Sequence, residues 1–259
     1  MNADAAPSTP GAGPLGLRTP WSAPAAAVAT ALIVLVSMLA ATAMAVLYFA
    51  LTRTAGDDFG ASRITLVNTM IGMLIAETIM VVLALWLAGW FKGSRWHVLS
   101  LDRPLTARMF VIGLGGMALI LLPYNAAIFL LWPDHFTADL RPFADLAKSD
   151  AAWVAAIVVA VGAPLSEELL FRGFLLPALT KSKLQFWGAA LLSTLAWTVM
   201  HWGYSAVGMI EVYIIGLYFC WLMWRFGSLW LTIALHAFYN ALQFAVLTQV
   251  TLPPLPQPV

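Results

Sequence analysis

The sequence has little charge with which to cover a water-facing surface. Only 10% of its 259 residues are charged, whereas 62% are hydrophobic. Ordinary soluble domains contain about 25% charged residues. This composition excludes a soluble globular protein, and it also excludes intrinsic disorder, which requires low hydrophobicity and high net charge. We therefore expect an integral membrane protein.

Cysteine and blocks of basic residues are also scarce. The single cysteine, Cys220, excludes an internal disulfide framework and any Cys-x-x-Cys metal site. The formal net charge is only +1, and without a basic block a nucleic-acid partner lacks electrostatic support. No internal repeat is visible, which argues against a transporter built from paired halves.

Long apolar runs are what the chain has in abundance. They approach the roughly 20 residues that a helix needs to cross about 30 Å of hydrocarbon, and they lack the alternation of barrel strands. The seven runs cover about 25–51, 65–91, 107–132, 152–180, 186–202, 206–224 and 228–250. The predicted fold class is therefore all-α, a polytopic transmembrane bundle of about seven to eight helices. The run 152–180 contains Gly162 and Pro164, which leaves open whether it forms one helix or two and the count open by one.

The chain divides into four parts by composition. Residues 1–21 are predicted to be a disordered N-terminal tail, and the Pro-rich residues 251–259 an extended C-terminal tail. Between them, residues 22–150 hold the N-terminal transmembrane helices, and residues 151–250 hold a transmembrane core that carries the candidate catalytic side chains.

The charges of the loops predict how the protein is oriented across the membrane. The loop 92–108 has a net charge of +3, and the loop 133–150 has a net charge of −2. Because basic loops stay in the cytoplasm, this alternation places the N-terminus there. The Ala-rich, Lys-poor composition is typical of a bacterial protein, and we expect a multi-pass protein of the inner (plasma) membrane.

Ionisable side chains inside the predicted spans are few, and each is a candidate for function because charge is costly in hydrocarbon. They are Glu77, Glu167, Glu168, Arg172, His201, Glu211 and His236, with Asn240 as a polar companion. At about 1.5 Å of rise per residue, three helices bring Glu167, His201 and Asn240 to depths of roughly 18–22 Å and His236 to roughly 12 Å. This agreement allows a single site near mid-membrane.

The spacing of these side chains along each helix distinguishes a structural ion pair from candidate catalytic groups. Glu168 and Arg172 stand at i,i+4 in the order that favours an ion pair, which predicts structural support. Glu167 points about 100° away around the helix without a partner in its own segment, and an unpaired buried carboxylate suits a general base. His236 and Asn240, also at i,i+4, present an imidazole and an amide to the same point.

Three motifs follow one another in the second half of the chain: Glu167-Glu168-x-x-x-Arg172, Trp197-x-x-x-His201 and His236-x-x-x-Asn240. This pattern resembles the CPBP (CAAX protease and bacteriocin-processing) family of intramembrane proteases, which includes the type II CAAX prenyl endopeptidases. The resemblance covers about residues 150–250. It departs from the family at Trp197, where Phe is usual.

The resemblance implies an intramembrane endopeptidase that cuts near the C-terminus of a membrane-associated protein or peptide. In this reading Glu167 and His201 activate a water molecule, while His236 and Asn240 stabilise the oxyanion. Glu167, His201 and His236 would also suffice as a catalytic zinc set. A water attack driven by a glutamate needs no metal, so both versions stay open. A prenylated protein, an unprenylated peptide and a lipid-linked precursor all fit as substrate.

Two other functions compete with the peptidase. One is a non-catalytic bacteriocin-immunity or scaffold protein of the same fold, which would not need the complete set of four catalytic side chains. The other is a transporter with Glu167, His201 and His236 as a proton relay, and the missing repeat argues against it.

Overall fold

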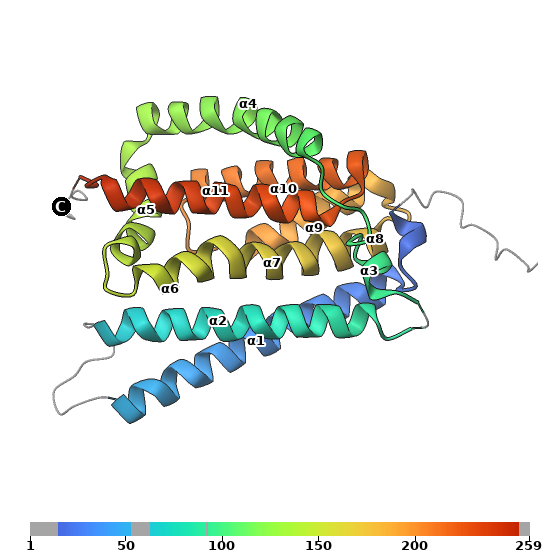
Figure 1. Cartoon of the computed structure of the whole chain (residues 1–259), viewed down its shortest axis with the longest axis horizontal. Helices are drawn as coiled ribbons and strands as arrows, with labels where there is room; N and C mark the ends of the chain where they lie inside the picture. The colour runs from blue at the N-terminus through green and yellow to red at the C-terminus, as the bar shows by residue number, and fades with distance from the viewer. Residues whose placement is uncertain (1–14, 53–62, 92, 254–259) are drawn as a thin grey trace, which may run out of the picture.

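The described part of the chain consists of helices joined by turns and loops (Figure 1). This computed structural model describes residues 15–52, 63–91 and 93–253, and those residues include no strand. The principal helices are α1 (Ala23–Thr52), α2 (Arg63–Ala88), α4 (Ala107–Leu131), α5 (Pro133–Ala147), α9 (Gln185–Val199), α10 (Ala206–Phe226) and α11 (Leu229–Gln249). The short turns η1 (Gly16–Arg18) and α3 (Arg95–Val98) lie at one end of the bundle.

The apolar run 152–180 forms one helical rod. Its segments are α6 (Ala152–Ile157), η2 (Val158–Gly162), α7 (Ala163–Glu167), η3 (Glu168–Leu175) and α8 (Leu176–Leu179). The stretches η2 and η3 are π-helical, with turns about one residue wider than those of an α-helix. No break occurs at Gly162 and Pro164, because a widened turn precedes the proline ring where a tighter α-turn would clash with it.

Six helices among the described residues are long and apolar enough to cross a membrane: α1, α2, α4, the rod, α10 and α11. The all-helical, polytopic fold expected from the apolar runs is confirmed. The seventh run, 186–202, differs from its prediction. Its helix α9 has 15 residues, about 22 Å of helix, and ends at Val199 because the chain turns over Met200–Tyr204.

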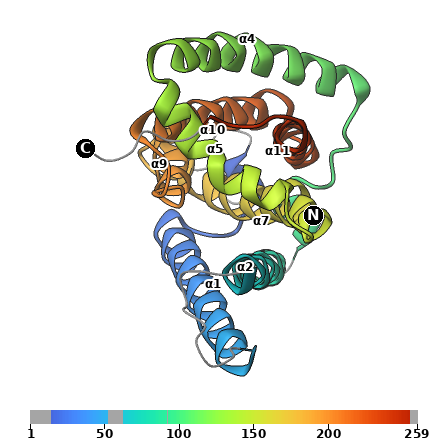
Figure 2. The same cartoon turned by 90° about the vertical axis from the view of Figure 1, so that its left-hand side faces the viewer.

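The rod lies at the centre of the bundle. Helices α1 and α2 pack on one side of it, and α10, α11 and finally α4 lie on the other (Figures 1 and 2). All eight residues of η3 are buried, whereas α1 exposes many large apolar side chains, as expected of a lipid-facing helix. The π-helical stretch that carries Glu168 and Arg172 is therefore the core of the fold.

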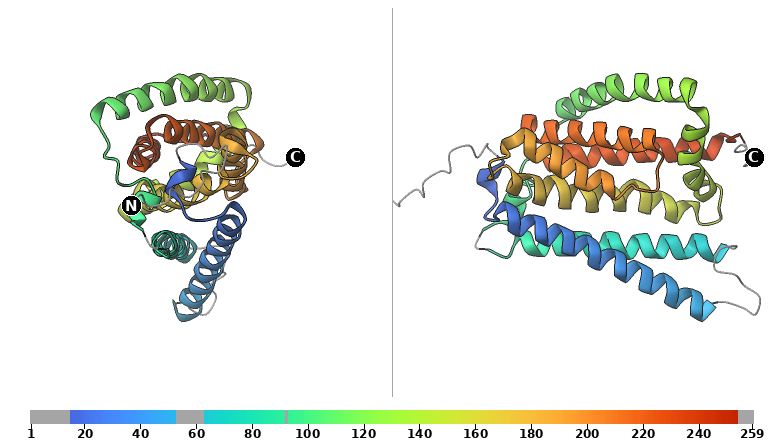
Figure 3. Two further views of the ribbon diagram at one scale, coloured as in Figure 1. Left: turned by 90° about the vertical axis from the view of Figure 1, so that its right-hand side faces the viewer. Right: turned by 180° about the vertical axis from the view of Figure 1, so that it is seen from behind.

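Helix α5 lies across the end of the bundle at which α9 stops short (Figures 2 and 3). Asp139 of α5 accepts hydrogen bonds from the backbone N–H of Ser205 at 2.7 Å and from its hydroxyl at 2.6 Å. The Ser205 hydroxyl in turn caps the first turn of α10. This contact ties α5 to the loop between α9 and α10.

Part of the predicted N-terminal tail is folded. Leu15 is buried, and the Trp21 ring packs edge-on against Phe91 and Phe174 at centroid distances of 5.2 and 5.3 Å. Lys181 Nζ donates to the carbonyl of Trp21 at 3.0 Å. The tail predicted over 1–21 is therefore packed from Leu15 onward, because its aromatic residue fills a gap in the bundle, and residues 1–14 lie outside the described residues.

The first residues of the predicted C-terminal tail are also packed against the bundle. Leu252 packs against the small apolar cluster beside α5, and Arg141 donates a hydrogen bond to the Pro253 carbonyl. The rest of the predicted tail, 254–259, lies outside the described residues.

Candidate active site

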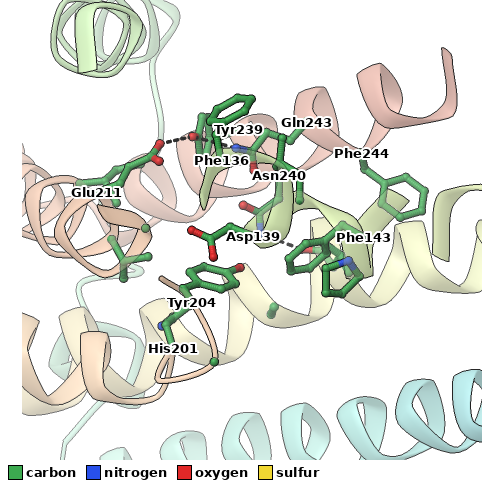
Figure 4. Close-up of a pocket in the computed structure, with 18 of the residues that line it drawn as sticks. Phe136, Asp139, Phe143, His201, Tyr204, Glu211, Tyr239, Asn240, Gln243 and Phe244 are labelled. Carbon is green, nitrogen blue, oxygen red and sulfur yellow. Dashed lines mark hydrogen bonds between the residues drawn. The ribbon is translucent and has the colours of Figure 1, made fainter. Parts of the chain in front are cut away.

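A cavity of about 590 Å³ opens between the rod, α4, α5, α10 and α11. Its wall includes the four side chains predicted to be catalytic, Glu167, His201, His236 and Asn240. They come from the rod, from the turn after α9 and from α11, and Figure 4 labels two of them, His201 and Asn240. The structure thus places all four around one space, and their roles remain predictions.

Glu167, the last residue of α7, is held by an indole. Trp197 Nε1 donates to Glu167 Oε2 at 2.6 Å, and the Trp197 side chain is buried. A phenylalanine at this position has no donor with which to make that hydrogen bond. The Trp197 departure from the family pattern therefore changes how the predicted base is oriented.

The same tryptophan holds His201 through its backbone. His201 Nδ1 lies 3.1 Å from the carbonyl oxygen of Trp197. Because a carbonyl only accepts, Nδ1 carries the proton of the neutral imidazole and Nε2 is left as the acceptor. The structure gives no direct hydrogen bond between Glu167 and His201 within the described residues, and Trp197 is the residue that both contact.

His236 is oriented by the buried ion pair of the rod. Its Nδ1 lies 3.1 Å from Glu168 Oε1, the oxygen that also accepts from Arg172 at 3.0 Å. The predicted i,i+4 pair is present, and both of its side chains are fully buried. The Arg172 guanidinium lies over the Trp197 ring, 4.0 Å from its centroid. Charge, cation–π contact and hydrogen bonding thus fix His236 and Trp197 together.

Asn240 lies one helical turn after His236 on α11. Its Nδ2 donates to the carbonyl of Val159, in the π-helical stretch η2, at 2.8 Å. Since a carboxamide nitrogen has two hydrogens, the second remains for a ligand in the cavity. The imidazole and the amide therefore face the same cavity, as their spacing predicts.

The described residues do not assemble the predicted zinc set. Among them, no group of three or more His, Cys, Asp or Glu side chains is arranged to hold a metal ion. Glu167, His201 and His236 all line the cavity, yet they do not converge on one point at ligand distance. As placed, these residues do not fit a three-ligand zinc centre.

Two further polar side chains that sequence reasoning passed over enter the cavity from the far end. Asp139 belongs to α5, and Tyr204 lies in the turn after His201 (Figure 4). Burial raises the pKa of Tyr204, and the charge of Glu167 raises it further. The phenol therefore keeps its proton and remains a hydrogen-bond donor beside the predicted catalytic groups.

The two remaining acidic candidates have different surroundings. Glu77 of α2 does not line the cavity: it is buried against Gly162, and neither of its carboxylate oxygens has a hydrogen-bond partner among the described residues. Glu211 of α10 lines the cavity and accepts hydrogen bonds from Asn125 of α4 and Tyr239 of α11. An asparagine inside an apolar run was the only sequence signal for the contact with α4.

Helix α10 packs closely behind Trp197, so a larger side chain in α10 tests whether this packing positions the site. A Cβ on Gly216 of α10 would lie 2.6 Å from Thr194 Cγ2 and 2.9 Å from the Trp197 ring. We expect Gly216→Ala to displace the indole, to destabilise the protein by about 1–3 kcal/mol and to lower the expected peptidase activity by up to about 10²-fold. Thermal unfolding and turnover of the purified variant check this.

Gly115 of α4 supplies the matched control, because a Cβ there meets nothing within 4 Å. Gly115→Ala should leave both unfolding and turnover close to wild type. Equal behaviour of the two variants would show that the approach of α10 to Trp197 does not position Glu167.

The comparisons with known proteins agree with this picture. Residues 149–242 match the family model described as type II CAAX prenyl endopeptidase Rce1-like. No curated protein matches the chain, and no solved structure matches it. The matched segment contains all three motifs and supports, at the level of the family, a CAAX-type intramembrane protease. The resemblance seen in the motifs is thus confirmed: over residues 149–242 the chain is similar to the Rce1-like type II CAAX prenyl endopeptidases.

Proposed function

We propose that the chain is a multi-pass membrane endopeptidase that hydrolyses a peptide bond near the C-terminus of a membrane-associated protein or peptide. The observation that carries this proposal is the cavity itself, where Glu167, His201, His236 and Asn240 meet. The family match over residues 149–242 supports the same reaction class.

In the proposed reaction, Glu167 takes a proton from a water molecule whose oxygen attacks the carbonyl carbon of the scissile bond. Trp197 Nε1 holds one carboxylate oxygen of Glu167, which leaves the other to face the water. His201, with Nδ1 on the Trp197 carbonyl, offers Nε2 as a second acceptor for the same water. This division fits a general base that is supported by a neighbouring imidazole.

The attack turns the carbonyl oxygen into an oxyanion that must be stabilised. The free hydrogen of Asn240 Nδ2 and the Nε2–H of a doubly protonated His236 donate to it. Glu168, which accepts from His236 Nδ1 and from Arg172, holds the imidazolium in place. When the intermediate collapses, the C–N bond breaks and Glu167 returns the proton to the leaving amine.

The proposal extends to the setting of the enzyme. We propose an inner-membrane protein of a bacterium with a cytoplasmic N-terminus. The loops with excess basic charge, including the one ahead of α4 and the turn 180–184, lie at one end of the bundle, and α5 lies at the other (Figure 1). The substrate is a peptide or protein, with lipidation such as a prenyl group as one form, that reaches the cavity from the bilayer.

The proposed function is tested with quenched fluorescent peptides that end in a CAAX sequence, with and without a prenyl group. Purified wild type in detergent should release a product whose mass places the cut near the C-terminus, and Glu167→Ala should not. A parallel arm with a chelator decides whether turnover needs a metal ion. No cleavage of any peptide by folded wild type would contradict the peptidase and favour a scaffold protein, whereas equal cleavage by both proteins would rule out Glu167 as its base.

A further inference from the structure

Glu211 is an acidic side chain in the cavity that the proposed hydrolysis does not use. Its Oε1 accepts from Asn125 Nδ2 at 2.8 Å and from the Tyr239 hydroxyl at 2.5 Å, the contact visible in Figure 4. Three helices, α4, α10 and α11, therefore meet at this one carboxylate oxygen.

Both side chains that donate to Glu211 Oε1 make a further hydrogen bond, which fixes the hydrogen that they present to it. Gln243 Nε2 donates to the Tyr239 oxygen at 2.8 Å, so the phenolic hydrogen is directed to Glu211 Oε1. Asn125 Nδ2 donates its other hydrogen to the carbonyl of Leu121 at 3.1 Å. Donors that converge in this way stabilise an ionised carboxylate and fix its orientation.

The second oxygen of Glu211 has no such partner. Among the described residues, no side chain or backbone N–H donates to Glu211 Oε2, and this residue lines the cavity. A carboxylate held at one oxygen and open at the other is a binding group for a donor that arrives with a ligand.

The described residues place no free cation beside this carboxylate, because the proposed imidazolium of His236 is paired with Glu168. The described residues that line the cavity include three carboxylates, Asp139, Glu167 and Glu211, and no Lys or Arg. Asp139 spends both oxygens on Ser205, and Glu167 is the proposed base. Because an unpaired charge is costly inside a membrane protein, the cation that balances Glu211 is expected to come from the substrate.

We propose that Glu211 is a specificity-determining residue that binds a lysine or arginine side chain of the peptide substrate. This inference rests on the proposed function and narrows its substrate class. Tyr239 lies three residues after His236 and directly before Asn240 on the same helix. A basic side chain at Glu211 is therefore bound next to the proposed oxyanion site, close in sequence to the scissile bond.

The experiment compares peptides that carry lysine with peptides that carry norleucine, a neutral residue of similar length, at each position around the cleaved bond. For wild type we expect kcat/KM to be about tenfold or more higher with lysine at one position. In Glu211→Gln this ratio should fall to near one. In Asp139→Asn, which removes the same charge from the same cavity, the ratio should persist.

Binding separates this inference from the proposed hydrolysis. In the Glu167→Ala background, the lysine peptide should bind more tightly than the norleucine peptide, and adding Glu211→Gln should remove the difference. That result stands even if no peptide is cleaved. A wild-type ratio near one in both assays overturns the inference whether or not Glu211→Gln folds, as does a ratio that Glu211→Gln leaves intact.

Discussion

Glu167→Gln should abolish peptide hydrolysis while the protein stays folded. Glutamine keeps the size of the side chain and an oxygen that accepts from Trp197 Nε1, the hydrogen bond made at 2.6 Å in the wild type. It cannot take a proton from water, and loss of a general base costs about 10²–10⁴-fold in rate. Steady-state turnover of a fluorescent peptide, with thermal unfolding measured alongside, checks both halves of the expectation.

Trp197→Phe is the graded control for this result. The carboxylate stays but loses its indole donor, so turnover should fall less than in Glu167→Gln and should not vanish. The ring under Arg172 is retained, which keeps the cation–π contact made at 4.0 Å. Full activity of Glu167→Gln would rule out Glu167 as the base, and full activity of Trp197→Phe would show that the hydrogen bond does not matter.

Arg172→Met should cause the largest loss of stability among single changes in the rod. Arg172 and Glu168 are both fully buried and 3.0 Å apart, so methionine leaves the Glu168 carboxylate without its counter-charge. Removal of one partner from a buried pair costs about 3–5 kcal/mol. Chemical or thermal unfolding of the purified protein in detergent measures the effect.

The double variant Glu168→Gln/Arg172→Met separates the lost ion pair from lost packing. It removes both charges, so we expect it to be more stable than Arg172→Met alone. Turnover should be low in the double variant despite its greater stability, because there His236 Nδ1 loses the Glu168 carboxylate that it contacts at 3.1 Å. A loss below about 1 kcal/mol in Arg172→Met would mean that the charges are solvated, contrary to their burial.

The fold could largely be predicted from the sequence because hydrocarbon allows few alternatives to helices. Six of the seven apolar runs are helices of membrane length. The short α9 could not be predicted, since Met200 and Trp202 in the turn after it are as apolar as the helix itself. The packing of Leu15 to Trp21 could not be predicted either, because these residues belong to a stretch whose composition is typical of a disordered tail.

The motifs predicted which side chains form the candidate site, but they predicted only those contacts that lie within a single helix. Spacing on one helix predicts the Glu168–Arg172 pair and the shared face of His236 and Asn240. Contacts between helices leave no such pattern: Asn125 and Glu211 are 86 residues apart in the chain. The hydrogen bond that Trp197 donates to Glu167 also depends on how α9 packs against the rod. The spacing of residues along α9 contains no information about that packing.

The π-helical stretches of the rod also constrain how this chain can change its length over evolution. A π-turn contains about one residue more than an α-turn, so losing one residue between Val158 and Leu175 would convert wide turns to ordinary ones. A residue lost from the α-turns between the two stretches cannot be absorbed in this way, and it rotates everything beyond it by about 100°, which would turn Arg172 away from Trp197 or Glu167 away from the cavity. Insertions and deletions should therefore accumulate in the loops of such proteins, while the length of this segment stays fixed.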